Sequence, residues 1–305
     1  MLRAARTTAD RVRARLRGPA EPDAPRPLRY RRSWEPSRQR KPTFPGLISQ
    51  ACTQSQIESP AFQALAVALD DRALMHRKQW EWCYIVQALA ERGMLQEGKR
   101  GLGFGVGTEP ITAYAAARGC EIVATDLPDE ADGSAHWVTG EQHASRLEDC
   151  NDRGLCDPEV FRRRVSFRPV DMRAIPEDLS GFDFTWSSCA MEHLGSIDAT
   201  LRFFEEQIAR LNAGGVGVHT TEFNVSSNDE TIAEGPTVVL RRLDIEHLVE
   251  RTVAAGHEME VTFALGRGRH DRHVDRPPFT NSHLKVELDG FVITSFGLIV
   301  TKRAG

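Results

Sequence analysis

Three alternating glycines, Gly103, Gly105 and Gly107, follow a short strand pattern in the stretch KRGLGFGVGTEP. Because glycine has no side chain, the backbone can turn sharply there and approach a ligand closely. A helical run comes next, and the N-terminal amides of a helix favour negative or polar groups. About 20 residues after the glycines, Asp126 ends a second apolar strand, where a carboxylate can accept hydrogen bonds from ribose hydroxyls. These features together predict a nucleoside-binding half-fold.

The spacing of the glycines argues against one class of nucleotide. A dinucleotide fingerprint requires G-x-G-x-x-G, or Ala in the last position. That last position holds Val106, Thr108 or Pro110, depending on the glycine from which the count starts. The sequence therefore disfavours a nicotinamide-dependent oxidoreductase.

The G-x-G-x-G pattern, with an acid closing the second strand, resembles the class I S-adenosylmethionine-dependent methyltransferases of the small-molecule type. The resemblance covers residues 99–305. It implies an α/β fold: a Rossmann-like, seven-stranded, mostly parallel sheet with helices on both faces, here with an N-terminal helical extension. One position departs from the family, because Gly101 stands where Asp or Glu is usual.

The resemblance also implies cofactor-binding residues. In the family, an acid at the end of the third strand accepts a hydrogen bond from the adenine amino group, and the next residue packs on the ring. The residues that this assigns to S-adenosylmethionine, together with a serine at the end of the fourth strand, are Gly103, Gly105, Gly107, Asp126, Asp171, Met172 and Ser187.

Periodicity and apolar runs predict the elements that position these residues. A helical pattern over 59–95 precedes the sheet. The resemblance implies that this helix lies over the cofactor, so Lys78, Gln79 and Trp80 are possible cofactor or lid contacts; the alternative is a packing helix with a solvated lysine. The predicted strands begin near Lys99 and continue as CEIVATDLP, VSFRPVDMRAIP, GFDFTWSS, GVGVHTTEFN, HEMEVTFAL and FVITSFGLIVTKR.

Polar residues after the fourth and fifth strands predict the reacting centre, since ligands of open α/β sheets bind beyond the carboxyl ends of the strands. After the fourth strand come Ser188, Cys189, Glu192 and His193. The fifth strand ends in HTTEFN, which contains His219 and Glu222. Methyl transfer often needs a base to remove a proton. We predict His219 as that base with Glu222 beside it, and His193 beside Glu192 as its competitor.

The same side chains admit another interpretation. Carboxylate and imidazole ligands suit Mg²⁺, Mn²⁺ or Zn²⁺ in different geometries. Glu192, His193, His219 and Glu222 could therefore hold a divalent metal, as in methyltransferases that act on RNA ends or on ring hydroxyls.

Composition limits the class of protein. The chain has 305 residues and 40% hydrophobic residues, enough for one large α/β domain with additions. Residues 1–45 carry 13 Lys or Arg against 4 Asp or Glu, whereas the rest has a net charge of −13. An acidic body argues against broad binding to a phosphate backbone. Six cysteines without a C-x-x-C pair indicate a reducing, cytoplasmic compartment, and no apolar run approaches a membrane span.

We therefore expect three regions: a basic, Pro- and Arg-rich flexible extension (1–45), a helical cap (46–98) and an S-adenosylmethionine-binding domain (99–305). The extension could alternatively be a transit peptide. The predicted function is methyl transfer to a small-molecule acceptor, an O-methylation of a sugar, a glycan or a natural product. The alternatives are a non-catalytic S-adenosylmethionine-binding regulatory module, which the missing acid at Gly101 favours, and a metal-assisted methyltransferase of an RNA end.

Overall fold

The computed structural model describes residues 39–70, 72–127, 144, 146–279 and 282–303. The chain divides between Arg38 and Gln39, and every described residue belongs to the second unit. Most of the predicted extension, 1–45, lies outside the described residues. Its last part does not: Phe44 is buried and its ring lies 5.3 Å from that of Phe62. The packed chain thus begins before the expected boundary at residue 46.

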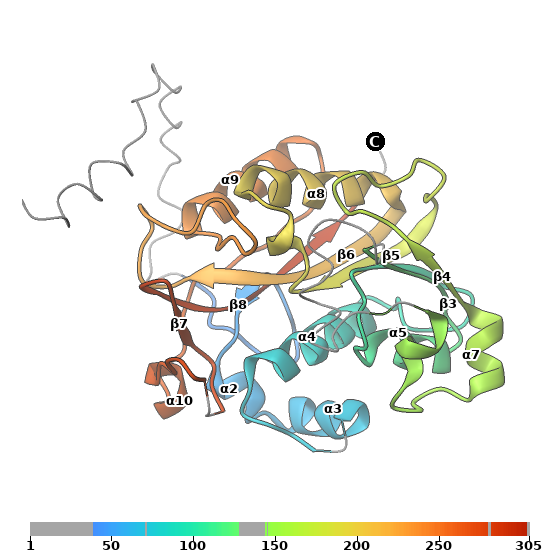
Figure 1. The fold of residues 1–305 in the computed structure, drawn as a ribbon, viewed down its shortest axis with the longest axis horizontal. Coiled ribbons are helices and arrows are strands. Elements are labelled where there is room, and N and C mark those ends of the chain that lie inside the picture. The colour runs from blue at the N-terminus through green and yellow to red at the C-terminus, as the bar shows by residue number, and fades with distance from the viewer. Residues whose placement is uncertain (1–38, 71, 128–143, 145, 280–281, 304–305) are drawn as a thin grey trace, which may run out of the picture. The chain divides into compact units, whose positions relative to one another are not determined.

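A single mixed sheet organises this unit (Figure 1). Its main path runs in the order β1-β8-β6-β5-β2-β3-β4, and β7 pairs with β8. Strands β2 to β6 pair in parallel, whereas β8 is antiparallel to its neighbours. The strands are β1 (Gln50–Ala51), β2 (Arg100–Phe104), β3 (Glu121–Asp126), β4 (Val165–Pro169), β5 (Phe182–Ser188), β6 (Leu211–Asn224), β7 (Val286–Leu288) and β8 (Phe291–Thr301). The predicted fold class is confirmed.

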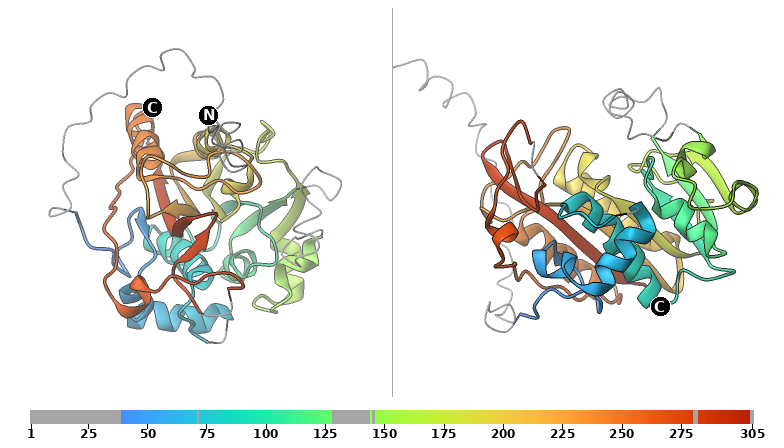
Figure 2. Two further views of the ribbon diagram at one scale, coloured as in Figure 1. Left: turned by 60° about the vertical axis from the view of Figure 1, so that its left-hand side comes forward. Right: turned by 90° about the horizontal axis from the view of Figure 1, so that it is seen from below.

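Helices cover both faces of the sheet, with α8 and α9 on one side and α3, α4 and α5 on the other (Figures 1 and 2). The α-helices are α2 (Gln54–Ile57), α3 (Pro60–Asp70), α4 (Arg77–Glu91), α5 (Ile111–Ala117), α7 (Pro158–Arg164), α8 (Ile197–Arg210), α9 (Arg242–Ala254) and α10 (Arg269–Arg272). The described residues also form two 3-10 helices, η2 (Leu147–Asn151) and η3 (Met191–His193). The helical pattern over 59–95 is two helices, α3 and α4. Within the described part of the chain, no helix has the length and apolar character needed to cross a membrane.

The prediction of a sixth strand over HEMEVTFAL is wrong. That segment makes only isolated bridges, Glu258 with Thr301 and Ser49 with Val261. Strand β1, which the sequence did not reveal, pairs with β8 instead at Gln50 and Ala51. Because β1 occupies that edge of β8, residues 258–262 can pair with β8 only at its C-terminal end, where Glu258 meets Thr301.

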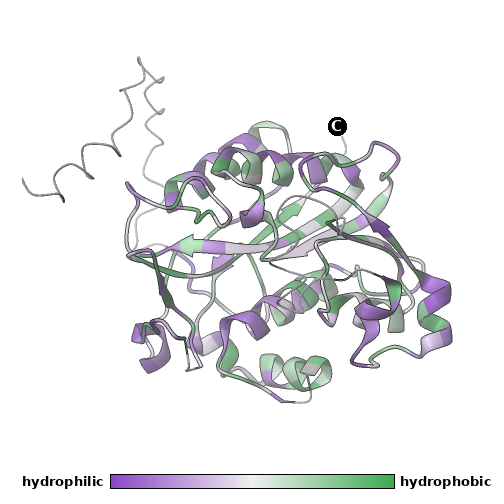
Figure 3. Cartoon of the chain, viewed as in Figure 1, coloured by the Kyte–Doolittle hydropathy of each residue, from purple (hydrophilic) through white to green (hydrophobic). Residues whose placement is uncertain are grey.

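The core forms where apolar helix faces meet the sheet, and Figure 3 shows polar residues mainly on the outer helix surfaces. Trp80 and Tyr84 of α4 stack with ring centroids 4.7 Å apart and are fully buried. A side chain on Gly101 would collide with the ring of Phe184. This packing explains why no acid stands at Gly101.

Candidate active site

A cavity of about 420 Å³ lies beyond the carboxyl ends of β2, β3, β4 and β5. Parallel strands bring their carboxyl ends to one edge of the sheet, so loops from distant parts of the sequence meet there. The lining residues are Lys78, Trp82, Gly105, Gly107, Thr108, Glu109, Asp126, Leu127, Arg153, Val170, Asp171, Met172, Arg173, Ser188, Cys189, Ala190, His193 and Leu194.

Two of the three predicted cofactor glycines line this cavity. Gly105 and Gly107 have φ angles of +55° and +51°, which L side chains rarely adopt. A Cβ atom on Gly105 would lie 2.8 Å from the Cβ of Ala190, another residue of the cavity lining. Gly103 has a different role, because a side chain there would collide with Trp186 in the core.

Asp126 ends β3 at the wall of the cavity and is buried. Its Oδ2 accepts hydrogen bonds from the backbone N–H of Gly107 (3.0 Å) and of Ala144 (3.2 Å). Its Oδ1 accepts from the N–H of Leu127 at 2.8 Å. These backbone donors hold the carboxylate beside the glycine turn.

Asp171 and Met172 follow β4 and both line the cavity, as the resemblance implied. The Arg173 guanidinium donates to both carboxylate oxygens of Asp171, from Nε at 3.0 Å and from Nη2 at 2.7 Å. This pairing lowers the pKa of Asp171. Met172 is buried and presents an apolar wall on which a flat ring could pack.

Strand alternation separates the two serines at the end of β5. Ser187 faces away from the cavity, and its hydroxyl lies 2.8 Å from Nδ1 of His219. Ser188 lines the cavity on the same side as Glu109, with which its hydroxyl interacts. The structure therefore places Ser188 in the cavity and the predicted Ser187 outside it.

His219 lies in the core, outside the cavity lining. Its ring is fully buried and makes edge contacts with Phe203 and Phe204 of α8, with centroids 5.6 and 5.5 Å away. Burial lowers the pKa of His219 to about 3, so the ring is neutral at neutral pH. Side chains alternate along β6, so Glu222 points to the opposite face of the sheet. The expectation that His219 faces the ligand crevice does not agree with this geometry.

His193 reaches the cavity from the end of η3. Its Nδ1 lies 2.8 Å from the carbonyl oxygen of Pro236, which can only accept, so Nδ1 carries the proton of the neutral ring. Nε2 then carries the lone pair. Nε2 also lies 4.0 Å from a carboxylate oxygen of Glu192. This tautomer suits a proton acceptor.

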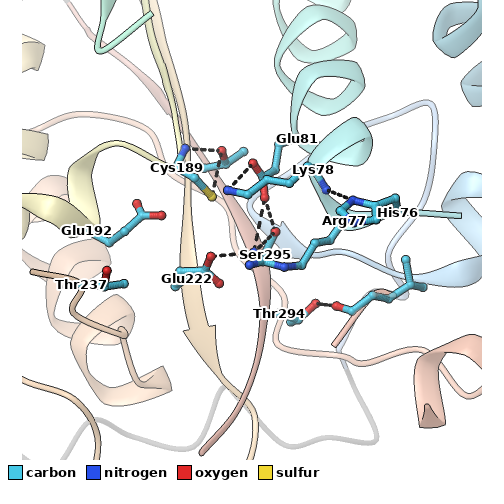
Figure 4. Close-up of polar contacts among 12 residues, drawn as sticks. His76, Arg77, Lys78, Glu81, Cys189, Glu192, Glu222, Thr237, Thr294 and Ser295 are labelled. Carbon is cyan, nitrogen blue, oxygen red and sulfur yellow. Dashed lines mark hydrogen bonds and ion pairs between the residues drawn. The ribbon is translucent and has the colours of Figure 1, made fainter. Parts of the chain in front are cut away.

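A buried charge cluster lies next to the cavity, where α4 meets β6 and β8 (Figure 4). Nη1 of Arg77 donates to Glu222 at 2.6 Å and to the Ser295 hydroxyl at 3.1 Å. Burial opposes the charge of Arg77, but Glu222 and Glu81 prevail and raise its pKa. Lys78 forms an ion pair with Glu81 at 3.3 Å and also lines the cavity.

Two glutamates near the cavity have carboxylate oxygens that no described group hydrogen-bonds. Both oxygens of Glu192 and Oε2 of Glu109 are in this condition. Burial raises the pKa of each to about 8, and the charge of Glu222 adds to the effect at Glu192. Glu109 was not predicted from the sequence, although a carboxylate two residues after the last glycine of the turn was a usable signal. Arg153 and Trp82 were not predicted either, and the sequence offers no comparable signal for them.

Of the four residues predicted as metal ligands, the structure brings three close to one another. Glu192 and Glu222 converge, together with Cys189, and His193 lies beside Glu192. His219 is not part of this group, because it lies on the other face of the sheet.

Comparison with known proteins adds only distant similarities. No protein-family model matches the sequence, and no curated protein matches it either. Among solved structures, the cyclase SpnF is 17% identical, with 72% of this chain and 80% of that chain covered and a TM-score of 0.46. The methyltransferase domain of bacterial CtHen1 is 15% identical, with coverages of 74% and 100% and a TM-score of 0.45. Magnesium protoporphyrin IX methyltransferase (ChlM) from Synechocystis PCC 6803 is 9% identical, with coverages of 73% and 86% and a TM-score of 0.42. Similarity at this level assigns no function to the chain.

Proposed function

We propose that this chain is a class I S-adenosylmethionine-dependent methyltransferase that acts on a small-molecule acceptor, by O-methylation of a sugar, a glycan or a natural product. One observation carries the proposal. A single cavity at the carboxyl ends of parallel strands combines the Gly105–Gly107 turn, the Asp126 carboxylate and the buried face of Met172.

The residues present fit the cofactor. Asp126 offers carboxylate oxygens to ribose hydroxyls, and Met172 offers an apolar surface to the adenine ring. The turn at Gly105 needs a residue without a side chain, since a Cβ there would collide with Ala190. The Ser188 hydroxyl lines the cavity and can bond a ligand. When bound, the cofactor supplies an electrophilic methyl group on a positively charged sulfur.

The protein must align the acceptor with this methyl group and remove the acceptor's proton. We assign Nε2 of His193 as the atom that takes the proton from the acceptor. The other ring nitrogen, Nδ1, donates its own proton to the carbonyl oxygen of Pro236, which leaves Nε2 with the lone pair. Lys78 and Glu109 line the same cavity and can bond the polar groups of an acceptor. His219, which we first expected to be the base, serves in this proposal as a core residue that orients Ser187.

A non-catalytic cofactor-binding module is the main competing function. The glycine at position 101, its only support in the sequence, has a packing explanation, since the ring of Phe184 fills that position. The two functions differ in turnover, so methyl transfer separates them.

The experiment uses the full chain. Isothermal titration with S-adenosylmethionine should show binding with one site, and titration with NAD should show none. A methyl-transfer assay against catechols, sugars and an RNA end should then detect transfer to one of the small molecules. Tighter binding of NAD than of S-adenosylmethionine would overturn the proposal. Binding of S-adenosylmethionine without transfer to any acceptor class would favour the regulatory module.

A further inference from the structure

Three residues beside the cavity, Cys189, Glu192 and Glu222, bring potential ligand atoms together. The Sγ of Cys189 and one carboxylate oxygen of each glutamate all lie within 4.8 Å of one another. Cys189 follows β5, Glu192 lies in η3, and Glu222 lies near the end of the neighbouring strand β6. Figure 4 shows the Glu192 carboxylate facing Cys189, and Glu222 below them bonded to Arg77.

These groups are buried and incompletely bonded. Glu192 is 0% exposed and Glu222 is 5% exposed. Neither oxygen of Glu192, nor Oε2 of Glu222, has a hydrogen-bond partner within the described part of the chain. A buried carboxylate without partners is costly, because it has lost its water and gained nothing in return. The unbonded oxygens of Glu192 are thus an independent sign that a ligand belongs there.

The spacing is short enough for one ion to contact all three ligand atoms. Zinc binds sulfur at about 2.3 Å and oxygen at about 2.0–2.2 Å, so two of its ligands are never more than about 4.6 Å apart. The three ligand atoms lie within 4.8 Å of one another, so small side-chain movements would bring them onto one metal ion.

The charges of the cluster agree with a divalent ion. Arg77 lies 2.6 Å from Glu222, and Lys78 lies 3.3 Å from Glu81, so each cation already has a carboxylate partner. Deprotonation of the Glu192 carboxyl and the Cys189 thiol on metal binding would supply two further negative charges. A divalent metal would neutralise both.

We propose that Cys189, Glu192 and Glu222 form a binding site for a divalent transition metal, with Zn²⁺ as its probe. Thiolate and carboxylate ligands together favour such a metal over Mg²⁺ or Ca²⁺, which prefer oxygen ligands alone. On binding, the Cys189 thiol and the Glu192 carboxyl lose their protons to solvent, and the bonds from sulfur and oxygen to the metal form. Three protein ligands leave a further position for water or for an acceptor oxygen.

Cys189 and His193 also line the cavity, so the metal would lie at its edge. In the proposed methyltransferase, this position suits an acceptor that presents a hydroxyl group. That detail depends on the proposed function, whereas the metal site itself does not.

The test measures metal binding alone, without cofactor or acceptor. The full chain is stripped with a chelator and titrated with ZnCl₂ by calorimetry, and then reconstituted with Co²⁺ for absorption spectroscopy. We expect one tight site per chain and a thiolate-to-cobalt charge-transfer band. Glu192→Gln should weaken Zn²⁺ binding at least about tenfold, the factor typical of lost metal contacts. Cys189→Ser should remove the charge-transfer band.

Two matched controls keep the test specific. Glu109→Gln alters another glutamate with an unbonded oxygen, and Cys150→Ser alters another buried thiol; both should keep wild-type Zn²⁺ affinity and the cobalt band. Circular dichroism checks the fold, and if Glu192→Gln is unfolded, the loss of the band in folded Cys189→Ser decides. The proposal is overturned if the wild type does not bind Zn²⁺. It is also overturned if folded Glu192→Gln and folded Cys189→Ser both bind Zn²⁺ with the affinity of the wild type. Failure of methyl transfer does not affect this result, because no methyl acceptor is present.

Discussion

The two sides of the cavity satisfy their polar groups in different ways. On the side of β2, β3 and β4, Asp126 accepts from backbone N–H groups and Asp171 is held by Arg173. On the side of β5 and β6, both oxygens of the buried Glu192 and one of Glu222 find no hydrogen-bond partner among the described residues. The first side is therefore preorganised by its own chain. The second side buries carboxyl oxygens that lack hydrogen-bond partners, which a bound ligand would satisfy.

The two histidines that were predicted as possible bases differ in a similar way. His193 lines the cavity with one nitrogen anchored on a carbonyl oxygen, whereas His219 is enclosed by two phenylalanine rings. Being a histidine at the end of an apolar strand does not make a residue catalytic. What matters is the face of the sheet to which the side chain points.

The largest expected effect tests that contrast. His193→Ala should lower turnover by roughly 10²–10⁴-fold, the usual contribution of a general base, and should leave S-adenosylmethionine affinity unchanged. His219→Ala should instead lower the melting temperature and reduce turnover of the folded fraction much less. Initial rates, titration calorimetry and thermal melts measure the three quantities. The assignment fails if His219→Ala, still folded, loses as much turnover as His193→Ala.

The glycine turn should produce the next largest effect. Gly105→Val adds side-chain atoms where a Cβ would already lie 2.8 Å from Ala190, at a φ of +55°. We expect S-adenosylmethionine binding to weaken by about 100-fold or more, a free-energy change of about 2.7 kcal/mol. Gly256→Ala is the control, because Gly256 has a φ of +89° but no atom near the added Cβ. Wild-type affinity in folded Gly105→Val would show that the cofactor binds elsewhere.

Removal of the ribose contact should have a smaller effect. Asp126→Ala takes away a charged acceptor worth about 1.5–3 kcal/mol, so S-adenosylmethionine affinity should fall at least about tenfold. Asp157→Ala serves as the control, since Asp157 caps α7 by accepting from the N–H groups of Glu159 and Val160. That variant should lose stability but keep its affinity. Equal affinity of folded Asp126→Ala and wild type would contradict the assignment.

The smallest expected effect concerns pH. Burial raises the pKa of Glu109 from 4.5 to about 8 in the folded protein. Between these values the unfolded chain has lost the proton that the folded chain keeps, so stability falls as pH rises through this window. Glu109→Gln cannot titrate, and its melting temperature should fall less between pH 5.5 and 8 than that of the wild type. Parallel pH profiles for the two proteins would show that Glu109 is not the group responsible.

Local patterns were sufficient for much of the fold. The glycine turn, the acid after β3 and the apolar strands that follow are short-range features, because strand periodicity and glycine conformations depend on neighbouring residues. They predicted a mostly parallel α/β sheet and six of its eight strands. The two short strands, β1 and β7, both pair with β8, β1 from a distant part of the chain and β7 as a hairpin neighbour. Two- or three-residue strands carry no periodic signal.

The site residues also fall into those that short-range patterns predicted and those that depended on strand pairing. Gly105, Gly107, Asp126, Asp171 and Met172 were predicted from sequence and lie in one cavity, since each follows directly from a strand end. Which serine and which histidine enter the cavity depended on the register of β5 against β6, where Ser187 pairs with His219. A shift of one residue would exchange every inward and outward side chain, and the sequence alone does not show that register.

From the sequence by itself, then, one could predict where the main strands end and which acidic and glycine residues lie at those ends. Only the tertiary structure decided which charges meet. Arg77 and Glu222 are 145 residues apart in the chain, yet their side chains lie 2.6 Å apart in the buried cluster. Such pairs depend on how helix α4 packs across the sheet, and that packing is set by the whole core rather than by any local pattern.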